Sequence, residues 1–139
     1  VDRFIGVDLS PRMIERARAT SLYAELEVAD MLQGLRARPD ASADLILAAD
    51  AMVYVADLPQ LLAEAHRVLV SGGLLAFTAE THGGEGVVIG QGLRYAHSAA
   101  YVRGAVDGAG LELALLENLS ARNEDHVPVP GLVAVAAKT

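Results

Sequence analysis

Short apolar runs of strand length recur along the chain, separated by segments with helical periodicity. Three of these runs lie in the first half, and an acidic residue follows each: Phe4–Val7 before Asp8, Leu22–Val28 before Asp30, and Asp44–Ala49 before Asp50. Apolar runs bounded by turn residues predict buried strands. The pattern therefore places a carboxylate at the end of three predicted strands.

Three segments carry the end signals or the spacing of helices. The expected helices begin at Pro11 after a Ser10 cap, cover Pro59–Val70 before Ser71–Gly73, and run from a Ser98 cap to Ala109 before Gly110. Serine caps, a first-turn proline and a closing glycine are the usual boundaries of helices. The first helix is expected to carry Met13, Ile14 and Ala17 on its inner face.

The remaining segments complete an α/β pattern. Further strands are predicted over Leu74–Thr78, Leu111–Asn118 and Gly131–Lys138, and loops over Arg36–Ser42, Thr81–His97 and Ser120–Pro130. Strands that alternate with helices predict a layered α/β fold with a mostly parallel sheet. The last two strands have no helix between them, which predicts an antiparallel hairpin at the C-terminal edge. We expect residues 1–139 to form a single domain.

Composition narrows the class of protein. The chain has 139 residues, of which 53% are apolar, no cysteine, and a net charge of -7. This charge argues against nucleic-acid binding, and Arg12, Arg16 and Arg18 are expected to be a solvated helix face. The longest apolar run, Val127–Ala137, is too short to span a bilayer, and no signal peptide is visible. A cytoplasmic protein without membrane contact is expected.

The order of these segments resembles class I S-adenosylmethionine-dependent methyltransferases. "FIGVDLSPRMIERAR" resembles their second strand and following helix, and "LEVADM" resembles the end of their third strand. "ADLILAADAMVYVADLPQLLAEAHRVLVSGGLLAFT" resembles strands four and five with the helix between them. The tail, from "RYAHSAAYVRGAVDGAGLEL" to "VPGLVAVAAK", is similar to the last helix and hairpin, more narrowly to methyltransferases associated with tetratricopeptide repeats. The resemblance implies a Rossmann-like methyltransferase fold.

The resemblance also implies a cofactor site for S-adenosylmethionine at the carboxyl ends of the strands, where ligands of open α/β sheets bind. The cofactor-binding residues that it implies are Asp8 for the ribose hydroxyls, Leu9 against the adenine or ribose, Asp30 for the adenine amine, Met31 beside it, and Ala49 with Asp50 at the methionine end. Simpler interpretations remain open for three of them. Asp8 would then cap the turn before Pro11, Leu9 would belong to the core, and Asp30 would be an exposed loop acid.

One part of the family pattern is not found in the sequence. The first strand and its glycine-rich loop, a pattern like E/DxGxGxG, have no counterpart, and Gly83–Gly86 follows the fifth-strand segment instead. We therefore expect the fold without its first strand–helix unit. That strand normally lies between the second and fourth, so its loss would pair those strands or leave their edges unpaired. A partner chain that fills the gap would make a homodimer.

Methyl transfer requires an acceptor held in line with the sulfonium, and a base where the acceptor carries a proton. His97 and Tyr95 are the predicted catalytic residues, and Tyr54 and His82 are further candidates to line the acceptor pocket. A structural role at the start of the following helix is the alternative for His97. No metal site is expected. The sequence thus predicts methyl transfer to an unidentified small molecule or protein, or else a degenerate module of the same fold that acts through dimerisation or protein interaction.

Overall fold

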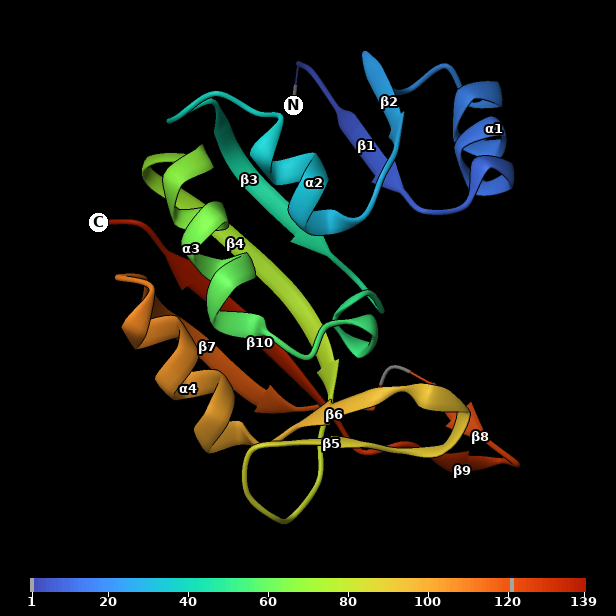
Figure 1. Ribbon diagram of the computed structural model, residues 1–139, viewed down its shortest axis with the longest axis vertical. Helices are drawn as coiled ribbons and strands as arrows, with labels where there is room; N and C mark the ends of the chain where they lie inside the picture. Colours follow the sequence, from blue (N-terminus) through green and yellow to red (C-terminus); the bar gives the residue numbers. More distant parts are fainter. Residues whose placement is uncertain (1, 121) are drawn as a thin grey trace. The chain divides into compact units, whose positions relative to one another are not determined.

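The computed structural model describes residues 2–120 and 122–139, and the chain divides into two compact units, Val1–Pro39 and Asp40–Thr139 (Figure 1). The first is called unit 1 and the second unit 2. Within the described residues, no helix has the length and apolar character needed to cross a membrane.

Unit 1 contains two strands and two helices. Its elements are β1 (Ile5–Asp8), α1 (Pro11–Ala19), β2 (Glu25–Val28) and α2 (Met31–Arg36), and β1 pairs with β2 in parallel. Helix α1 begins as predicted, because the Ser10 side chain accepts a hydrogen bond from the Met13 amide. Ile14 is buried, whereas Met13, expected on the same inner face, is 50% exposed. Successive helical residues point about 100° apart, so a short helix that buries one narrow stripe cannot bury both.

Helix α2 was not expected from the sequence. Asp30 caps it, and the Gln33 side chain accepts a hydrogen bond from the Asp30 amide in return, which makes a capping box. An acid followed three residues later by Gln is a recognised start signal of a helix. The short length of α2 and its internal Gly34 conceal the helical period that would have supported this signal.

Unit 2 contains a mixed six-stranded sheet. Its elements are β3 (Ala43–Ala48), η1 (Met52–Tyr54), α3 (Leu58–Val68), β4 (Leu69–Glu80), β5 (Val87–Ile89), η2 (Gln91–Leu93), β6 (Tyr95–His97), α4 (Ala99–Gly108), β7 (Glu112–Asn118), β8 (Asn123–Glu124), β9 (Val127–Pro128) and β10 (Gly131–Ala137). The strand order is β5-β6-β4-β10-β7, with β3 also paired to β4. Parallel pairing joins β4 to β3 and β6, and antiparallel pairing joins β10 to β4 and β7. The predicted C-terminal hairpin is confirmed.

The core of unit 2 lies between this sheet and the two helices that cover one of its faces, α3 and α4 (Figure 1). The helices contribute apolar residues at helical spacing, and β4 and β10 contribute every second residue, which gives the buried set Leu58, Leu61, Leu62, Ala65, Val68, Val102, Ala105, Val106, Leu75, Phe77, Ala79, Leu132, Ala134 and Ala136. Alternate strand residues face opposite sides of a sheet, so one face alone enters this core.

Strand β3 was expected to be buried, but two of its leucines are not. Leu45 and Leu47 are 51% and 71% exposed, and Leu74, the β4 residue in register with Leu45, is 41% exposed. These side chains lie on the face of the sheet opposite to Phe77. Helices α3 and α4 cover the face that carries Phe77. The run Asp44–Ala49 is apolar on both faces, as in strands of doubly covered sheets, while unit 2 covers only one of them.

Two predicted boundaries in unit 2 are wrong. Helix α3 ends at Val68, and Ser71–Gly73, expected to close it, lies inside β4. Gly72 has a φ of 82°, and the register between β3 and β4 shifts in this segment, so the glycines serve an irregularity of the strand. The predicted loop Thr81–His97 contains β5, η2 and β6, because its glycines separate short strands that pair with each other.

Candidate functional site

The first group of predicted site residues lies at the carboxyl end of the β1–β2 pair. Asp8 is the last residue of β1, and its carbonyl accepts a hydrogen bond from the Ala29 amide at 3.1 Å, directly before Asp30. Because the strands are parallel, Asp8 and Asp30 follow the same edge of this pair. Open α/β sheets bind ligands at such edges.

Asp8 holds the turn that leads into α1. Its Oδ1 atom accepts a hydrogen bond from the Ser10 amide at 2.8 Å, and the residue is exposed. The turn-capping role considered for Asp8 is therefore present. A carboxylate has about four acceptor positions, so this one bond leaves capacity for further donors. Leu9 is 65% exposed and is not part of the core.

Asp30 is the N-cap of α2, which explains its position better than the alternative of an exposed loop acid. Its Oδ1 atom accepts a hydrogen bond from the Gln33 amide at 2.8 Å. Met31 is the first residue of α2, and both Asp30 and Met31 are half-buried. A capping carboxylate also benefits from the positive end of the helix dipole.

Asp50 and Ala49 follow β3 in unit 2. The Asp50 amide donates to Thr78 Oγ1 at 2.8 Å, and the residue has a φ of 52°. The Asp50 side chain is 58% exposed and already accepts a hydrogen bond from Arg94 at 2.7 Å. Ala49 is exposed.

Arg94 and Arg122 converge on a second carboxylate, that of Glu80 at the end of β4. Arg94 Nη2 lies 2.6 Å from Glu80 Oε2, and Arg122 Nη2 lies 3.0 Å from Glu80 Oε1. Burial raises the pKa of Glu80, but the hydrogen bonds from Arg122 and Arg94 outweigh it, so that this pKa lies below its usual value. The Arg94 guanidinium also lies 5.8 Å from the centre of the Tyr54 ring, a cation–π distance.

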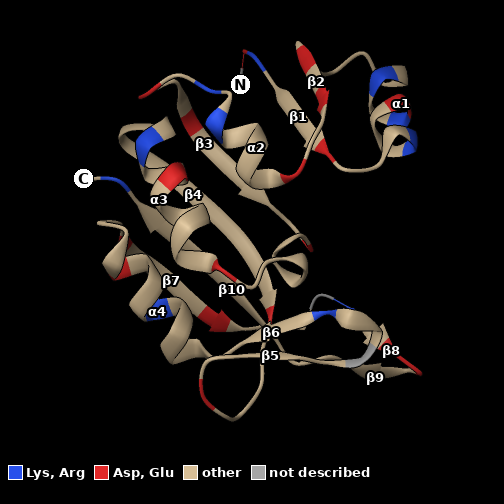
Figure 2. Ribbon diagram, in the orientation of Figure 1, with Lys and Arg blue, Asp and Glu red and all other residues tan. Residues whose placement is uncertain are grey.

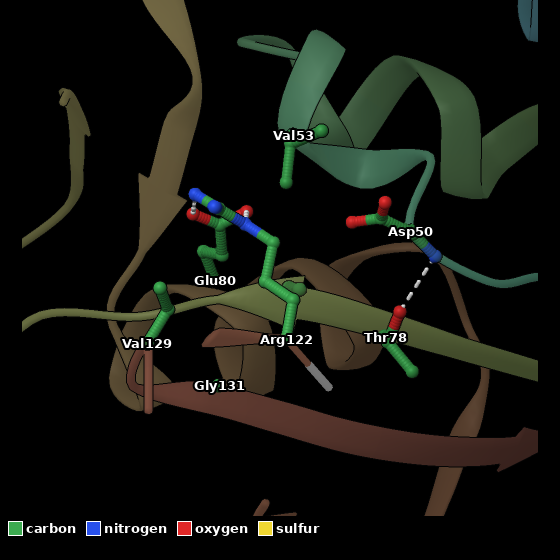
Figure 3. Close-up of a pocket in the computed structure, with 8 residues that line it drawn as sticks. Asp50, Val53, Thr78, Glu80, Arg122, Val129 and Gly131 are labelled. Atoms are coloured by element: carbon green, nitrogen blue, oxygen red, sulfur yellow. Dashed lines mark hydrogen bonds and ion pairs between the residues drawn. The ribbon is translucent and has the colours of Figure 1, made fainter. Parts of the chain in front are cut away.

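A small pocket opens beside this ion network. Figure 3 shows Asp50 and Val53 on one side of it and Arg122, Glu80 and Val129 on the other, with the Asp50–Thr78 hydrogen bond at its edge. Its cavity volume is about 10 Å³, which suits a single water molecule rather than a cofactor. A ligand of Asp50 must therefore approach from the exposed side of this carboxylate.

His97 and Tyr95, the predicted catalytic residues, lie in β6. The His97 ring is fully buried, lies 5.8 Å from the Tyr101 ring in a stacked arrangement, and donates from Nε2 to the Val55 carbonyl at 2.7 Å. Its Nδ1 atom has no hydrogen-bond partner in the described part of the chain. Burial lowers the pKa of His97, which favours the neutral ring. Tyr95 is half-buried.

Tyr54 and His82, the further candidates for the acceptor pocket, differ in their hydrogen bonding and exposure. His82 is tied to its own loop, since Nδ1 accepts from the Gly84 amide at 3.1 Å and Nε2 donates to the Gly86 carbonyl at 2.9 Å. Tyr54 is 66% exposed. Across residues 2–120 and 122–139, no cluster of three or more His, Cys, Asp or Glu side chains is arranged to hold a metal ion.

Sequence reasoning missed the ion network of unit 2. Arg94 and Asp50 are 44 positions apart, and Arg122 and Glu80 are 42 apart, so no spacing rule relates them. Figure 2 colours the acidic and basic residues of the chain, and the exposed arginines of α1 lie on that helix as predicted.

Comparison with protein families identifies one of them. A family model described as "Methyltransferase domain" matches residues 1–77, more than half of the chain. No curated protein sequence matches significantly. The chain is similar in structure to an S-adenosylmethionine-dependent methyltransferase from Mesorhizobium loti, with a TM-score of 0.79 and 20% identity over 99% of this chain and 81% of that chain.

Two other solved structures are also similar in fold. An S-adenosylmethionine-dependent methyltransferase from Methanosarcina mazei has a TM-score of 0.76 and 16% identity over 96% of this chain and 81% of that chain. The 1,6-didemethyltoxoflavin-N1-methyltransferase of Burkholderia thailandensis, with bound 1,6-didemethyltoxoflavin and S-adenosylhomocysteine, has a TM-score of 0.74 and 16% identity over 99% of this chain and 61% of that chain. At this identity the likeness shows the fold, which confirms the Rossmann-like prediction.

Proposed function

The chain belongs to the methyltransferase domain family, and from this premise we propose that it transfers a methyl group from S-adenosylmethionine to a small-molecule or protein acceptor. The proposal extends to a cytoplasmic location. Three solved structures of similar fold are S-adenosylmethionine-dependent methyltransferases or contain S-adenosylhomocysteine, which supports this choice of cofactor.

The carboxyl end of the β1–β2 pair is the observation that carries the proposal. Asp8 is exposed and uses one oxygen for the Ser10 amide, so it has capacity to accept hydrogen bonds from the two ribose hydroxyls. Leu9 is 65% exposed and offers apolar surface to the adenine or ribose. Asp30 and Met31, at the same edge, would accept from the adenine amine and contact its ring.

Asp50 and Ala49 are the residues proposed for the methionine end of the cofactor. Asp50 would accept a hydrogen bond from the ammonium group of the cofactor, and the small side chain of Ala49 beside it leaves room for the methionine part of the cofactor. The exposed side of the Asp50 carboxylate supports this role. A charge-assisted hydrogen bond of this kind is roughly twice as strong as a neutral one.

For acceptor chemistry we retain His97 and Tyr95. The lowered pKa keeps the His97 ring neutral at neutral pH, and its Nδ1 lone pair is the free acceptor that a general base needs. Access to this buried ring requires movement of the surrounding loops. The hydroxyl of half-buried Tyr95 would orient the acceptor.

Calorimetric titration of the chain with S-adenosylmethionine and S-adenosylhomocysteine tests the proposal. We expect both to bind, and we expect Asp8→Ala to weaken binding at least tenfold, about 1.4 kcal/mol. Asp57→Ala is the matched control, because Asp57 also caps a helix, through the Gln60 amide, but has no proposed ligand. No binding at millimolar ligand would overturn the proposal. An unchanged affinity of Asp8→Ala would leave Asp8 as a turn cap alone.

An alternative function is association through β3, as in a module that acts by dimerisation. The exposed Leu45 and Leu47 favour it, since apolar side chains on an edge strand invite pairing with another chain. The expected state is a homodimer. Sedimentation equilibrium of the wild type and of Leu47→Lys tests this, because a monomeric wild type excludes the alternative, and dissociation by Leu47→Lys supports it.

A further inference from the structure

Two hydrogen bonds hold His97 in place within unit 2. Its Nε2 atom lies 2.7 Å from the Val55 carbonyl oxygen, and its own backbone carbonyl accepts a hydrogen bond from Thr81 Oγ1 at 2.7 Å. A carbonyl oxygen can only accept, so Nε2 carries the proton of the neutral ring and Nδ1 keeps the lone pair. The Val55 carbonyl therefore selects the tautomer that leaves Nδ1 free to accept a proton.

Tyr101, in the first turn of α4, contacts both the His97 ring and the segment that follows Val55. The two rings lie 5.8 Å apart with 22° between their planes, and the Tyr101 hydroxyl donates to the Ala56 carbonyl at 3.3 Å. Stacked rings at this distance attract each other in a preferred orientation. One side chain thus restricts rotation of the imidazole and holds the peptide segment that carries its acceptor.

The backbone of Tyr101 is itself anchored. Its amide donates to Ser98 Oγ at 3.1 Å, and the Ser98 amide donates to the Gly86 carbonyl at 2.9 Å. Ser98 and Val102, on either side of Tyr101 in this turn, are both buried. The Tyr101 ring therefore offers a fixed surface to the imidazole.

We propose that Tyr101 is a positioning residue that holds the His97 ring against the Val55 carbonyl, so that Nδ1 stays unprotonated and available as a base. This inference rests on the proposed function, because it assigns His97 to proton transfer. Tyr101 acts through His97 and needs no contact with the acceptor. Without the Tyr101 ring, the imidazole can turn away from Val55 and lose the bond that selects its tautomer.

Two-bond ¹H–¹⁵N spectra of the histidine rings at neutral pH test the inference, because they distinguish the two neutral tautomers. His97→Gln identifies the His97 signals by their loss. In the wild type we expect about a tenfold excess of the Nε2–H tautomer, the factor that an ordinary hydrogen bond supplies. In Tyr101→Leu this ratio should fall about threefold, within the range of an aromatic pair. Tyr101→Phe keeps a ring to stack on and should restore most of the ratio.

Tyr23→Leu is the matched control, because Tyr23 also pairs with an aromatic ring, that of Phe4 in unit 1. Its His97 tautomer ratio should equal that of the wild type. If Tyr101→Leu does not fold, Tyr101→Met takes its place, since a flexible methionine fills apolar gaps without presenting a ring. An unchanged ratio in the folded variant overturns the positioning role, and so does an excess of the Nδ1–H tautomer in the wild type.

The tautomer measurement needs no ligand, so its failure is distinguishable from that of the proposed function. If the wild type does not bind S-adenosylhomocysteine at millimolar concentration, the proposed function fails and the role of Tyr101 in catalysis fails with it. If the wild type binds but Tyr101→Leu keeps the wild-type tautomer ratio, only the role of Tyr101 is overturned.

Discussion

The acids at the strand ends of unit 1 and unit 2 are held in opposite ways. In unit 1, Asp8 and Asp30 accept hydrogen bonds from backbone amides two and three residues further along the chain. In unit 2, Asp50 and Glu80 bind the guanidinium of Arg94, which lies 44 and 14 positions away. In unit 1 the donors are neutral and close in sequence, whereas in unit 2 the donor is charged and distant in sequence.

This difference determines what each acid can offer a ligand. A backbone amide orients a carboxylate without neutralising its charge, so the unit 1 acids keep their charge for an incoming donor. The unit 2 acids already have a cationic partner, so part of their charge is neutralised before any ligand arrives. The carboxylates of unit 1 are therefore unpaired with a cation through the hydrogen bonds that orient them, whereas that of Asp50 is paired with one.

Glu80→Gln should produce the largest change in stability. The substitution removes the charge that both Arg94 and Arg122 bind at a side chain only 15% exposed. Hydrogen bonds to charged groups contribute about 1.5–3 kcal/mol each, and Arg94 keeps Asp50 as a partner, so we expect a loss of about 2 kcal/mol in the free energy of unfolding. Urea denaturation at pH 7 measures it. A loss below about 0.5 kcal/mol would show that the network contributes little.

The same variant should also change the acid sensitivity of the protein. The lowered pKa of Glu80 means that its stabilisation is fully present above the usual carboxyl value of 4.5 and is lost as the pH falls through the lowered pKa. The difference between wild type and Glu80→Gln should therefore shrink below about pH 4.5. Glu124→Gln is the control, because Glu124 is 47% exposed and lies 3.6 Å from Arg122. Its stability should equal that of the wild type within about 0.5 kcal/mol.

His97→Gln tests a second long-range contact. The Gln amide can still donate to the Val55 carbonyl but cannot titrate. Because burial lowers the pKa of His97, the unfolded chain binds a proton more readily than the folded protein. Wild-type stability should thus be complete above about pH 6.5 and fall with decreasing pH, and this share of the slope should be missing in the variant. Urea denaturation from pH 5 to 8 shows it, and identical slopes would contradict the buried neutral ring.

Local signals in the sequence predicted the local features of the fold. Ser10 and Ser98 cap the starts of α1 and α4 through hydrogen bonds to amides three residues further along the chain. Both partners of such a bond lie in one short segment, so the sequence alone reveals it. The apolar run of β3 likewise predicted a strand at its observed place. The capping box of α2 was present in the same way, but Asp30 was interpreted only as a strand-end acid.

Other features depend on partners that no pattern reveals. The exposed state of Leu45 and Leu47 depends on which faces of the sheet are covered, and the strands near Val87 and Tyr95 depend on pairing with each other. The partner of Asp50 lies in a hairpin that the sequence presents as a glycine-rich loop. Candidate acids were therefore predictable as residues, while their electrostatic state was not.

Asp30→Ala sharpens the comparison at its local end and should have the smallest effect. Loss of the cap to the Gln33 amide should cost about 1 kcal/mol in the free energy of unfolding, measured by urea denaturation. Asp30→Ser is the matched variant, since serine also caps helices but its side chain is shorter and uncharged. If Asp30 also binds the adenine amine, Asp30→Ser should recover most of the stability yet still bind S-adenosylhomocysteine more weakly than the wild type. Full recovery of both the stability and the affinity for S-adenosylhomocysteine would show that Asp30 acts only as a helix cap.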